Sequence, residues 1–151
     1  MIERISNPDF LELMEEAFSR GSTVCFTPSG TSMLPMLNGT TDTVTLSKKP
    51  SQLHQYDVIF YVREGGVFVL HRIVKCEKDG TFTLSGDSQY YLEKGVRYED
   101  VKALMTSYTH LGKERSVTSF SYQFYIRRMI LKKRIRMFLS SVYHKVLSHN
   151  P

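Results

Sequence analysis

Six short segments between residues 23 and 109 constrain the fold of this chain most strongly. Each is rich in Val, Ile, Phe, Tyr and Thr, and residues that favour turns separate them, which is the pattern of short β-strands. Glu64-Gly65-Gly66 and Lys78-Asp79-Gly80 predict hairpin turns between neighbouring strands. Six strands in about 90 residues predict a mainly β fold, as a compact, mostly antiparallel barrel or folded sheet. The segments are TVCFT (23–27), TVTLS (43–47), DVIFYV (57–62), GVFVLHRIVKCE (66–77), TFTLSGD (81–87) and VKALMTSY (101–108).

The residues before the strands predict a helix within residues 1–22. Asn7 can cap it, Pro8 fits its first turn and Gly21 stops it. Its apolar residues recur at spacings of three and four, which predicts one face that packs on the rest of the domain. These residues are Phe10, Leu11, Met14, Ala17 and Phe18.

The last part of the chain predicts a basic amphipathic helix. Residues 119–147 contain no Gly, Pro, Asp or Glu, and apolar and basic residues recur at helical spacing. Three roles are open. The helix lies on an anionic membrane surface, where each basic residue adds about 1 kcal/mol, or it docks on the β domain, or it contacts nucleic acid. The membrane role is preferred and the nucleic-acid role is least expected.

Charge is divided unevenly along the chain, and this bears on its partners. Residues 113–151 carry nine Lys or Arg and one acid, whereas residues 1–112 carry eleven Lys or Arg and fourteen acids. The net charge of +5 therefore belongs to the tail, and we do not expect nucleic acid as a partner of the rest of the chain. The sequence thus divides into an N-terminal helix (1–22), a catalytic domain (23–112) and a basic tail (113–151).

Targeting signals and cysteines bear on location. Charges interrupt residues 1–21 throughout, which is unlike a signal peptide, and no window approaches 18 uncharged apolar residues. We therefore expect a cytoplasmic protein with peripheral contact to the inner face of the membrane through residues 119–147. Cys25 and Cys76 stand alone without CxxC spacing, so buried or free thiols are expected and no metal site.

Three polar residues together suggest nucleophilic catalysis. Ser32 lies in a Gly-Thr-Ser-Met-Leu-Pro loop, His71 in an otherwise apolar strand, and Asp87 in a Gly-Asp turn after a strand. A serine hydroxyl needs a base within hydrogen-bond reach, and neutral imidazole suits that task. A carboxylate on the other ring nitrogen fixes the tautomer of the imidazole. Each residue alone is more often structural, but the three together predict a Ser-His-acid site that needs no cofactor.

The order of four short motifs resembles that of the signal peptidase I and LexA-like (S24/S26) serine peptidases. They are Ser32-Met33-Leu34-Pro35, Tyr56-Asp57-Val58, His71-Arg72-Ile73 and Gly86-Asp87. A histidine in a His-Arg-Ile context is similar to the endoplasmic-reticulum and archaeal signal peptidases, whereas the bacterial housekeeping enzymes and LexA use lysine. Unlike that type, this chain is expected to have no N-terminal membrane anchor.

The resemblance implies a fold, an activity and roles for these residues. The fold is the barrel-like catalytic fold of the family, and the activity is peptide cleavage after small residues through an acyl-enzyme on Ser32. His71 is the general base, Asp87 its orienting acid with Glu93 as the alternative, and the oxyanion site uses the Ser32 N–H with a hydroxyl of Ser29 or Thr31.

Two other functions are weighed against the peptidase. A LexA-like self-cleaving regulator fits less well, because 31 residues precede Ser32 and no Ala-Gly or Cys-Gly cleavage site is present. A non-catalytic peptide-binding module would retain the same fold without the chemistry. We therefore expect a serine endopeptidase that acts on peptide or leader-peptide substrates.

Overall fold

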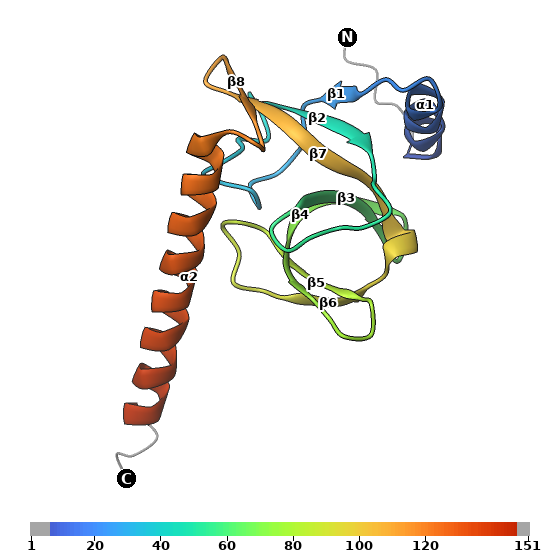
Figure 1. The fold of residues 1–151 in the computed structure, drawn as a ribbon. Helices are drawn as coiled ribbons and strands as arrows, with labels where there is room; N and C mark the ends of the chain where they lie inside the picture. The colour runs from blue at the N-terminus through green and yellow to red at the C-terminus, as the bar shows by residue number, and fades with distance from the viewer. Residues whose placement is uncertain (1–6, 148–151) are drawn as a thin grey trace. The chain divides into compact units, whose positions relative to one another are not determined.

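The computed structural model describes the backbone of residues 7–147 and the side chains of residues 9–133 and 135. The chain divides after Val117 into two units, the first with all eight strands and the second with one long helix. Figure 1 shows the arrangement of the elements within each unit. In order they are α1 (Asn7–Ser19), β1 (Val24–Phe26), β2 (Thr43–Lys48), β3 (Val58–Arg63), β4 (Val67–Cys76), β5 (Phe82–Ser85), β6 (Glu93–Val96), η1 (Tyr98–Asp100), β7 (Val101–His110), β8 (Lys113–Ser116) and α2 (Phe120–Leu147).

The strands form one antiparallel sheet in the order β1-β2-β7-β3-β4-β5-β6, with β8 paired to β7. The mainly β, antiparallel fold is confirmed, and so are the six predicted strands. The expected barrel closure is wrong for the described strands, because the sheet has two ends. At one end β1 pairs only with β2, and at the other β6 pairs only with β5. These end strands have three and four residues, and the chain leaves the sheet directly after β1.

Two strands were not predicted from the sequence. β6 and β8 have the sequences EKGV and KERS, which lack the apolar alternation of a half-buried strand. Each lies at a margin of the sheet and is held by backbone pairing to a neighbour. The sheet therefore extends to Ser116, past the residue where the charge pattern begins the tail.

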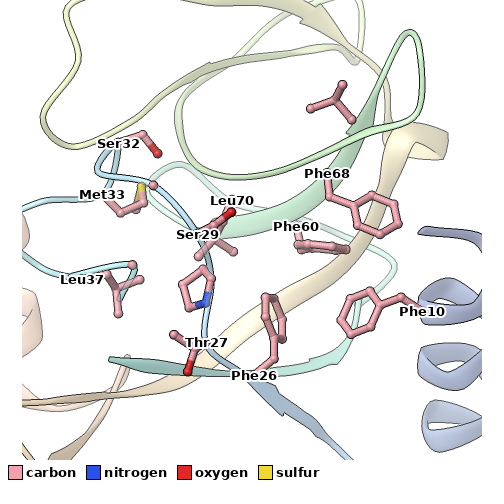
Figure 2. Close-up of a pocket in the computed structure, with 14 residues that line it drawn as sticks. Phe10, Phe26, Thr27, Ser29, Ser32, Met33, Leu37, Phe60, Phe68 and Leu70 are labelled. Carbon is pink, nitrogen blue, oxygen red and sulfur yellow. The ribbon is translucent and has the colours of Figure 1, made fainter. Parts of the chain in front are cut away.

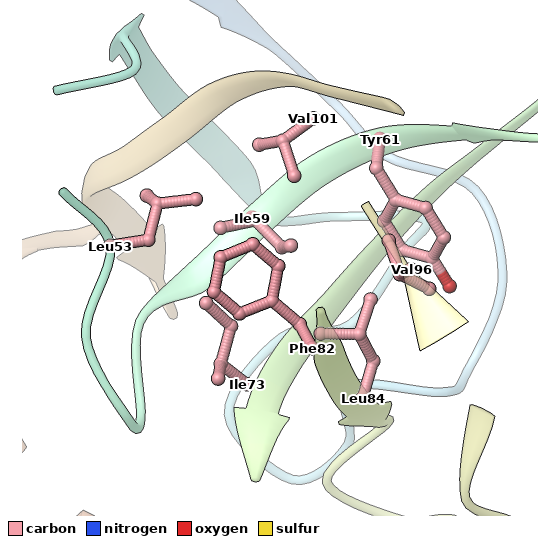
Figure 3. Close-up of a cluster of buried hydrophobic side chains, with 8 residues drawn as sticks. All are labelled: Leu53, Ile59, Tyr61, Ile73, Phe82, Leu84, Val96 and Val101. Atoms are coloured by element: carbon pink, nitrogen blue, oxygen red, sulfur yellow. The ribbon is translucent and has the colours of Figure 1, made fainter. Parts of the chain in front are cut away.

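The main core lies on one face of β3, β4 and β5 and of their neighbours. Ile59 and Tyr61 on β3 point to the same side as Ile73 on β4 and Leu84 on β5, because alternate residues of a strand share a face. Figure 3 shows these side chains packed together. The cluster consists of Leu53, Ile59, Tyr61, Ile73, Phe82, Leu84, Val96 and Val101.

Helix α1 covers aromatic residues on another part of the sheet. Met14 is buried, and the other residues of the predicted apolar face are partly buried, which confirms that face. The ring of Phe10 lies 5.2 Å from that of Phe26 and 5.9 Å from that of Phe60. Phe60 in turn lies 5.1 Å from Phe68. These four phenylalanines therefore join α1, β1, β3 and β4 at one place.

The second unit is the helix α2, and its existence and extent are as predicted. It runs through the basic and apolar residues without a break. No helix in the described part of the chain is long and apolar enough to cross a membrane. In the first unit, Cys25 and Cys76 are free thiols and both are exposed.

Candidate functional site

The loop that carries Ser32 is held at several points. Met33, Met36 and Leu37 are buried, and the Leu37 N–H donates to the Met33 carbonyl at 3.0 Å. A Cβ on Gly39 would lie 2.2 Å from the carbonyl oxygen of Gly30, so only glycine permits this crossing of the loop. The loop is therefore a packed structure, as a nucleophile needs.

The end of this loop is anchored to β7. Asp42 accepts a hydrogen bond from the Asn38 N–H at 2.7 Å and lies 2.6 Å from Nδ1 of His110. Burial alone would raise the pKa of Asp42, but these two hydrogen bonds outweigh burial and hold it below its usual range. The carboxylate is thus charged near neutral pH and ties the loop to the sheet.

The turn after β5 packs directly against Ser32. The N–H and the hydroxyl of Ser88 both donate to the Ser32 carbonyl at 3.0 Å. A Cβ on Gly86 would lie 2.5 Å from that carbonyl oxygen and 3.0 Å from the Ser32 Cβ. Glycine is therefore required in the Gly-Asp motif for a steric reason, because any side chain at this position would clash with Ser32.

Asp87 is bound to the arginine that follows His71. Nε and Nη2 of Arg72 donate to the two oxygens of Asp87 at 2.8 and 2.7 Å. Nη1 of Arg72 also donates to the Tyr56 carbonyl at 2.9 Å, and Nη2 lies 3.3 Å from the sulfur of Met36. Arg72 thus links β4, the start of β3, the serine loop and the Gly-Asp turn.

His71 lies on the core side of β4, beside Tyr61 and Glu93. Its side chain is two residues from that of Ile73 and so shares its face, and only 3% of the residue is exposed. Nδ1 of His71 lies 3.3 Å from the Tyr61 hydroxyl and 4.0 Å from Oε2 of Glu93. Glu93, the alternative acid named from the sequence, therefore lies near His71.

Hydrogen bonds define the protonation of Tyr61 and Glu93. The Tyr61 hydroxyl donates to Oε2 of Glu93 at 2.5 Å, and Nη2 of Arg63 donates to the same oxygen at 2.5 Å. Burial, and next the bond to Glu93, raise the pKa of Tyr61. Burial would raise the pKa of Glu93, but the bonds from Arg63 and Tyr61 lower it overall. Near neutral pH the pair is therefore a neutral phenol and a carboxylate.

This assignment indicates the tautomer of His71. The phenol proton lies toward Glu93, so the Tyr61 oxygen is left to accept a hydrogen bond from Nδ1–H of His71. A histidine protonated on Nδ1 carries its basic lone pair on Nε2. Tyr61 and Glu93 thus favour the tautomer that can act as a base at Nε2.

Ser32 lies at one end of an apolar cavity of about 560 Å³. Figure 2 shows Ser32 and Met33 at this end and the four phenylalanines at the other. Ser29 lines the cavity with Ser32, whereas Thr31 does not. On β4 the lining includes Leu70 but not His71, whose side chain lies on the opposite, core face of the strand. The lining residues are Phe10, Phe26, Thr27, Pro28, Ser29, Gly30, Ser32, Met33, Leu37, Gly39, Phe60, Val67, Phe68 and Leu70.

One strand edge and one loop segment border the cavity. β5 pairs with β4 only from Arg72 onward, so Val67–Leu70 have β3 on one side and no strand on the other among the described residues. β1 is an end strand, and Thr27 and Ser29, which follow it, line the cavity. The edge of β4 and the segment after β1 therefore both contribute residues to the cavity.

The structure brings the predicted residues into two groups. Ser32 and Ser29 line the cavity, and Asp87 lies behind Ser32 through the Gly86 turn and Arg72. His71 and Glu93 lie together on the core side. Sequence reasoning missed Tyr61, Arg63 and Arg72 as parts of the site. Arg72 carried a signal, because a charged residue inside an apolar strand needs a buried partner.

No family model matches this chain, and comparisons with curated proteins and with solved structures likewise find no match.

Proposed function

We propose that this protein is a serine endopeptidase that resembles the His-type signal peptidases. The observation that carries the proposal is the position of Ser32 at the end of an apolar cavity, with the Gly86 turn packed behind it. Ser85 is paired with Arg72, so an antiparallel continuation sets Gly86 beside His71. Because Gly86 also packs against Ser32, this continuation would bring the serine loop close to His71.

The reaction follows from the roles of these groups. Ser32 Oγ attacks the peptide carbonyl while Nε2 of His71 takes its proton, and His71 then gives that proton to the leaving amine. Water, deprotonated by His71, hydrolyses the resulting ester on Ser32. The Ser32 N–H and the Ser29 hydroxyl would stabilise the oxyanion. Ser29 is preferred to Thr31 because it lines the cavity.

Glu93, through Tyr61, would orient the histidine and stabilise the imidazolium that forms. Asp87 would act as a positioning residue, because its hydrogen bonds to Arg72 hold the turn behind Ser32. This division of roles departs from the sequence-based expectation that Asp87 is the acid that orients His71. Its support is the 4.0 Å distance from Glu93 to His71.

An extended peptide would bind along the edge of β4 that borders the cavity. An edge strand offers unpaired N–H and C=O groups to a peptide that adds as a further strand. Val67–Leu70 provide such an edge, and the segment after β1 also lines the cavity. A bound peptide would then pass in front of Ser32.

The test is labelling by a serine-directed acylating probe, read by intact-protein mass spectrometry. Wild type should label at one site, and Ser32→Ala and His71→Ala should each lose labelling. Ser51→Ala and His54→Ala are matched controls, since both residues are exposed and lie outside the site. The proposal fails if wild type labels no faster than the Ser32→Ala and His71→Ala variants.

A peptide-binding module without catalysis is the second candidate. The side chain of His71 is buried on the core face and does not line the cavity, as a structural histidine would be. This candidate predicts peptide binding by wild type with no acylation of Ser32. The labelling experiment therefore separates the two functions.

The long helix supports the proposed contact with an anionic membrane. Four of its exposed apolar residues are spaced by four, seven and four, which places them on one side of a helix. Exposed Arg127, Arg128 and Lys132 lie on the same helix, and their charge suits anionic lipid headgroups. The four residues, named here the apolar stripe, are Phe120, Phe124, Leu131 and Ile135.

A further inference from the structure

We propose that the cavity beside Ser32 selects peptides with a large apolar side chain near the cleaved bond. The inference rests on the proposed function only where it refers to cleavage. The selection of the side chain is a property of peptide binding. It departs from the small residues that the family resemblance implies. The substrate class is a peptide with Leu, Met or Phe at the position that faces the cavity.

The size of the cavity is the first argument. Its volume of about 560 Å³ falls within the range of roughly 300–1,000 Å³ for sites that enclose whole small-molecule ligands. An alanine methyl group would fill only a small part of this space. The phenylalanine rings also pack against one another at 5.1–5.9 Å, so they hold the far end open as a wall.

The chemistry of the lining is the second argument. Among the described residues that line the cavity none is charged, and its polar side chains are Thr27, Ser29 and Ser32. Figure 2 places Ser32 at the end opposite the phenylalanine rings. A peptide backbone at Ser32 would therefore direct a side chain into an aromatic space. Such a space favours apolar side chains and rejects charged ones.

The far end of the cavity is formed by several elements, whereas its rim is exposed. The four phenylalanines come from α1, β1, β3 and β4, elements that are far apart in the sequence. Val67 also lines the cavity and is 52% exposed, so it stands at the rim. A large residue at the rim would reduce the space without disturbing the buried packing.

Binding to the Ser32→Ala protein tests the inference without requiring catalysis. The probes are fluorescein-labelled hexapeptides of Ala and Gly in which each central position in turn is Ala, Leu, Phe or Glu. Fluorescence anisotropy measures each dissociation constant. At one of the central positions, the peptides with Leu or Phe should bind at least about tenfold more tightly than the peptide with Ala. The peptide with Glu at that position should not bind.

A rim variant locates the selection in the cavity. Val67→Trp in the Ser32→Ala protein should reduce the Leu-over-Ala preference to less than about threefold. Leu111→Trp is the control, because Leu111 is exposed at the β7–β8 turn and should leave the preference unchanged. Loss of the preference in both variants would place the selection elsewhere and overturn the inference.

The remaining outcomes are also decisive. Equal binding of the Ala, Leu and Phe peptides, tighter binding of Ala, or binding of no peptide overturns the inference whatever the wild type does. A clear preference for Leu and Phe, with no acylation or cleavage by wild type, refutes the peptidase and leaves an apolar peptide-binding cavity. A preference with cleavage of the same peptides supports both.

Discussion

Breaking the buried ion pair between Arg72 and Asp87 should destabilise the domain strongly. The side chains are 1% and 0% exposed, and two hydrogen bonds of 2.8 and 2.7 Å join them. Removing either partner leaves the other charge buried without compensation, which costs about 3–5 kcal/mol. Because domains are stable by only about 5–15 kcal/mol, Asp87→Ala should remove a large part of the free energy of unfolding.

The assay is urea denaturation followed by circular dichroism, with the free energy of unfolding taken from the midpoint at constant slope. Arg72→Met should cost about as much as Asp87→Ala. The double variant Arg72→Met with Asp87→Leu should cost less than either single change, because no buried charge remains. Glu16→Ala is the control, since its pair with Arg20 is exposed and should contribute about 0.5 kcal/mol or less.

Two results would refute this reasoning about the pair. One is a loss below about 1 kcal/mol in both single variants, the value of an exposed pair. The other is a double variant whose loss equals the sum of the two single losses. The folded double variant also tests the role of Asp87: acylation of Ser32 at the wild-type rate would exclude Asp87 as the acid that serves His71.

Three further changes test the turn, the acid and the helix. In Gly86→Ala the new Cβ would press on Ser32, so acylation should fall about 100-fold. Ser51→Ala, at an exposed residue outside the site, should keep the rate, and equal rates in all three proteins would contradict the contact. The lowered pKa of Glu93 means that its carboxylate stabilises the fold above the ordinary value of about 4.3 and that this stabilisation is lost as the pH falls. The stability difference between wild type and Glu93→Gln should therefore shrink from pH 7 to about pH 3 in urea denaturation, and a constant difference would argue against it. Replacing Phe124 and the rest of the apolar stripe by Ser should lower flotation with phosphatidylglycerol vesicles at least about tenfold, whereas unchanged flotation would remove the membrane proposal.

Most of the sheet could be predicted because six of its strands carry an apolar pattern. β5 is buried at every residue and β3 at its first four, so their sequences FTLS and VIFYVR are together mostly apolar. β8 is exposed on every residue, and its formation depends on backbone hydrogen bonds to β7. Backbone pairing does not require an apolar side-chain pattern, so such a strand cannot be predicted from the sequence.

Whether the sheet closes into a barrel could not be predicted from the sequence either. A barrel and a folded sheet have the same strand pattern and differ only in whether the end strands meet. Here β1 and β6 are the ends, and the long loop after β1 carries Ser32.

The partner of His71 depends on strand register, which explains why two acids remained open from the sequence. His71 and Arg72 are neighbours on β4, so their side chains point to opposite faces. Leu84 on β5 is paired with both Ile73 and Glu93, which sets Glu93 on the core face with His71. Arg72 is paired with Ser85, and Asp87, two residues further on, reaches the face of Arg72. Because His71 and Arg72 point to opposite faces, they contact different acids. The pairing of β5 with β6 places Glu93 on the face of His71. That pairing includes irregularities in register, so no count of residues from Ser32, His71 or Asp87 could have provided it.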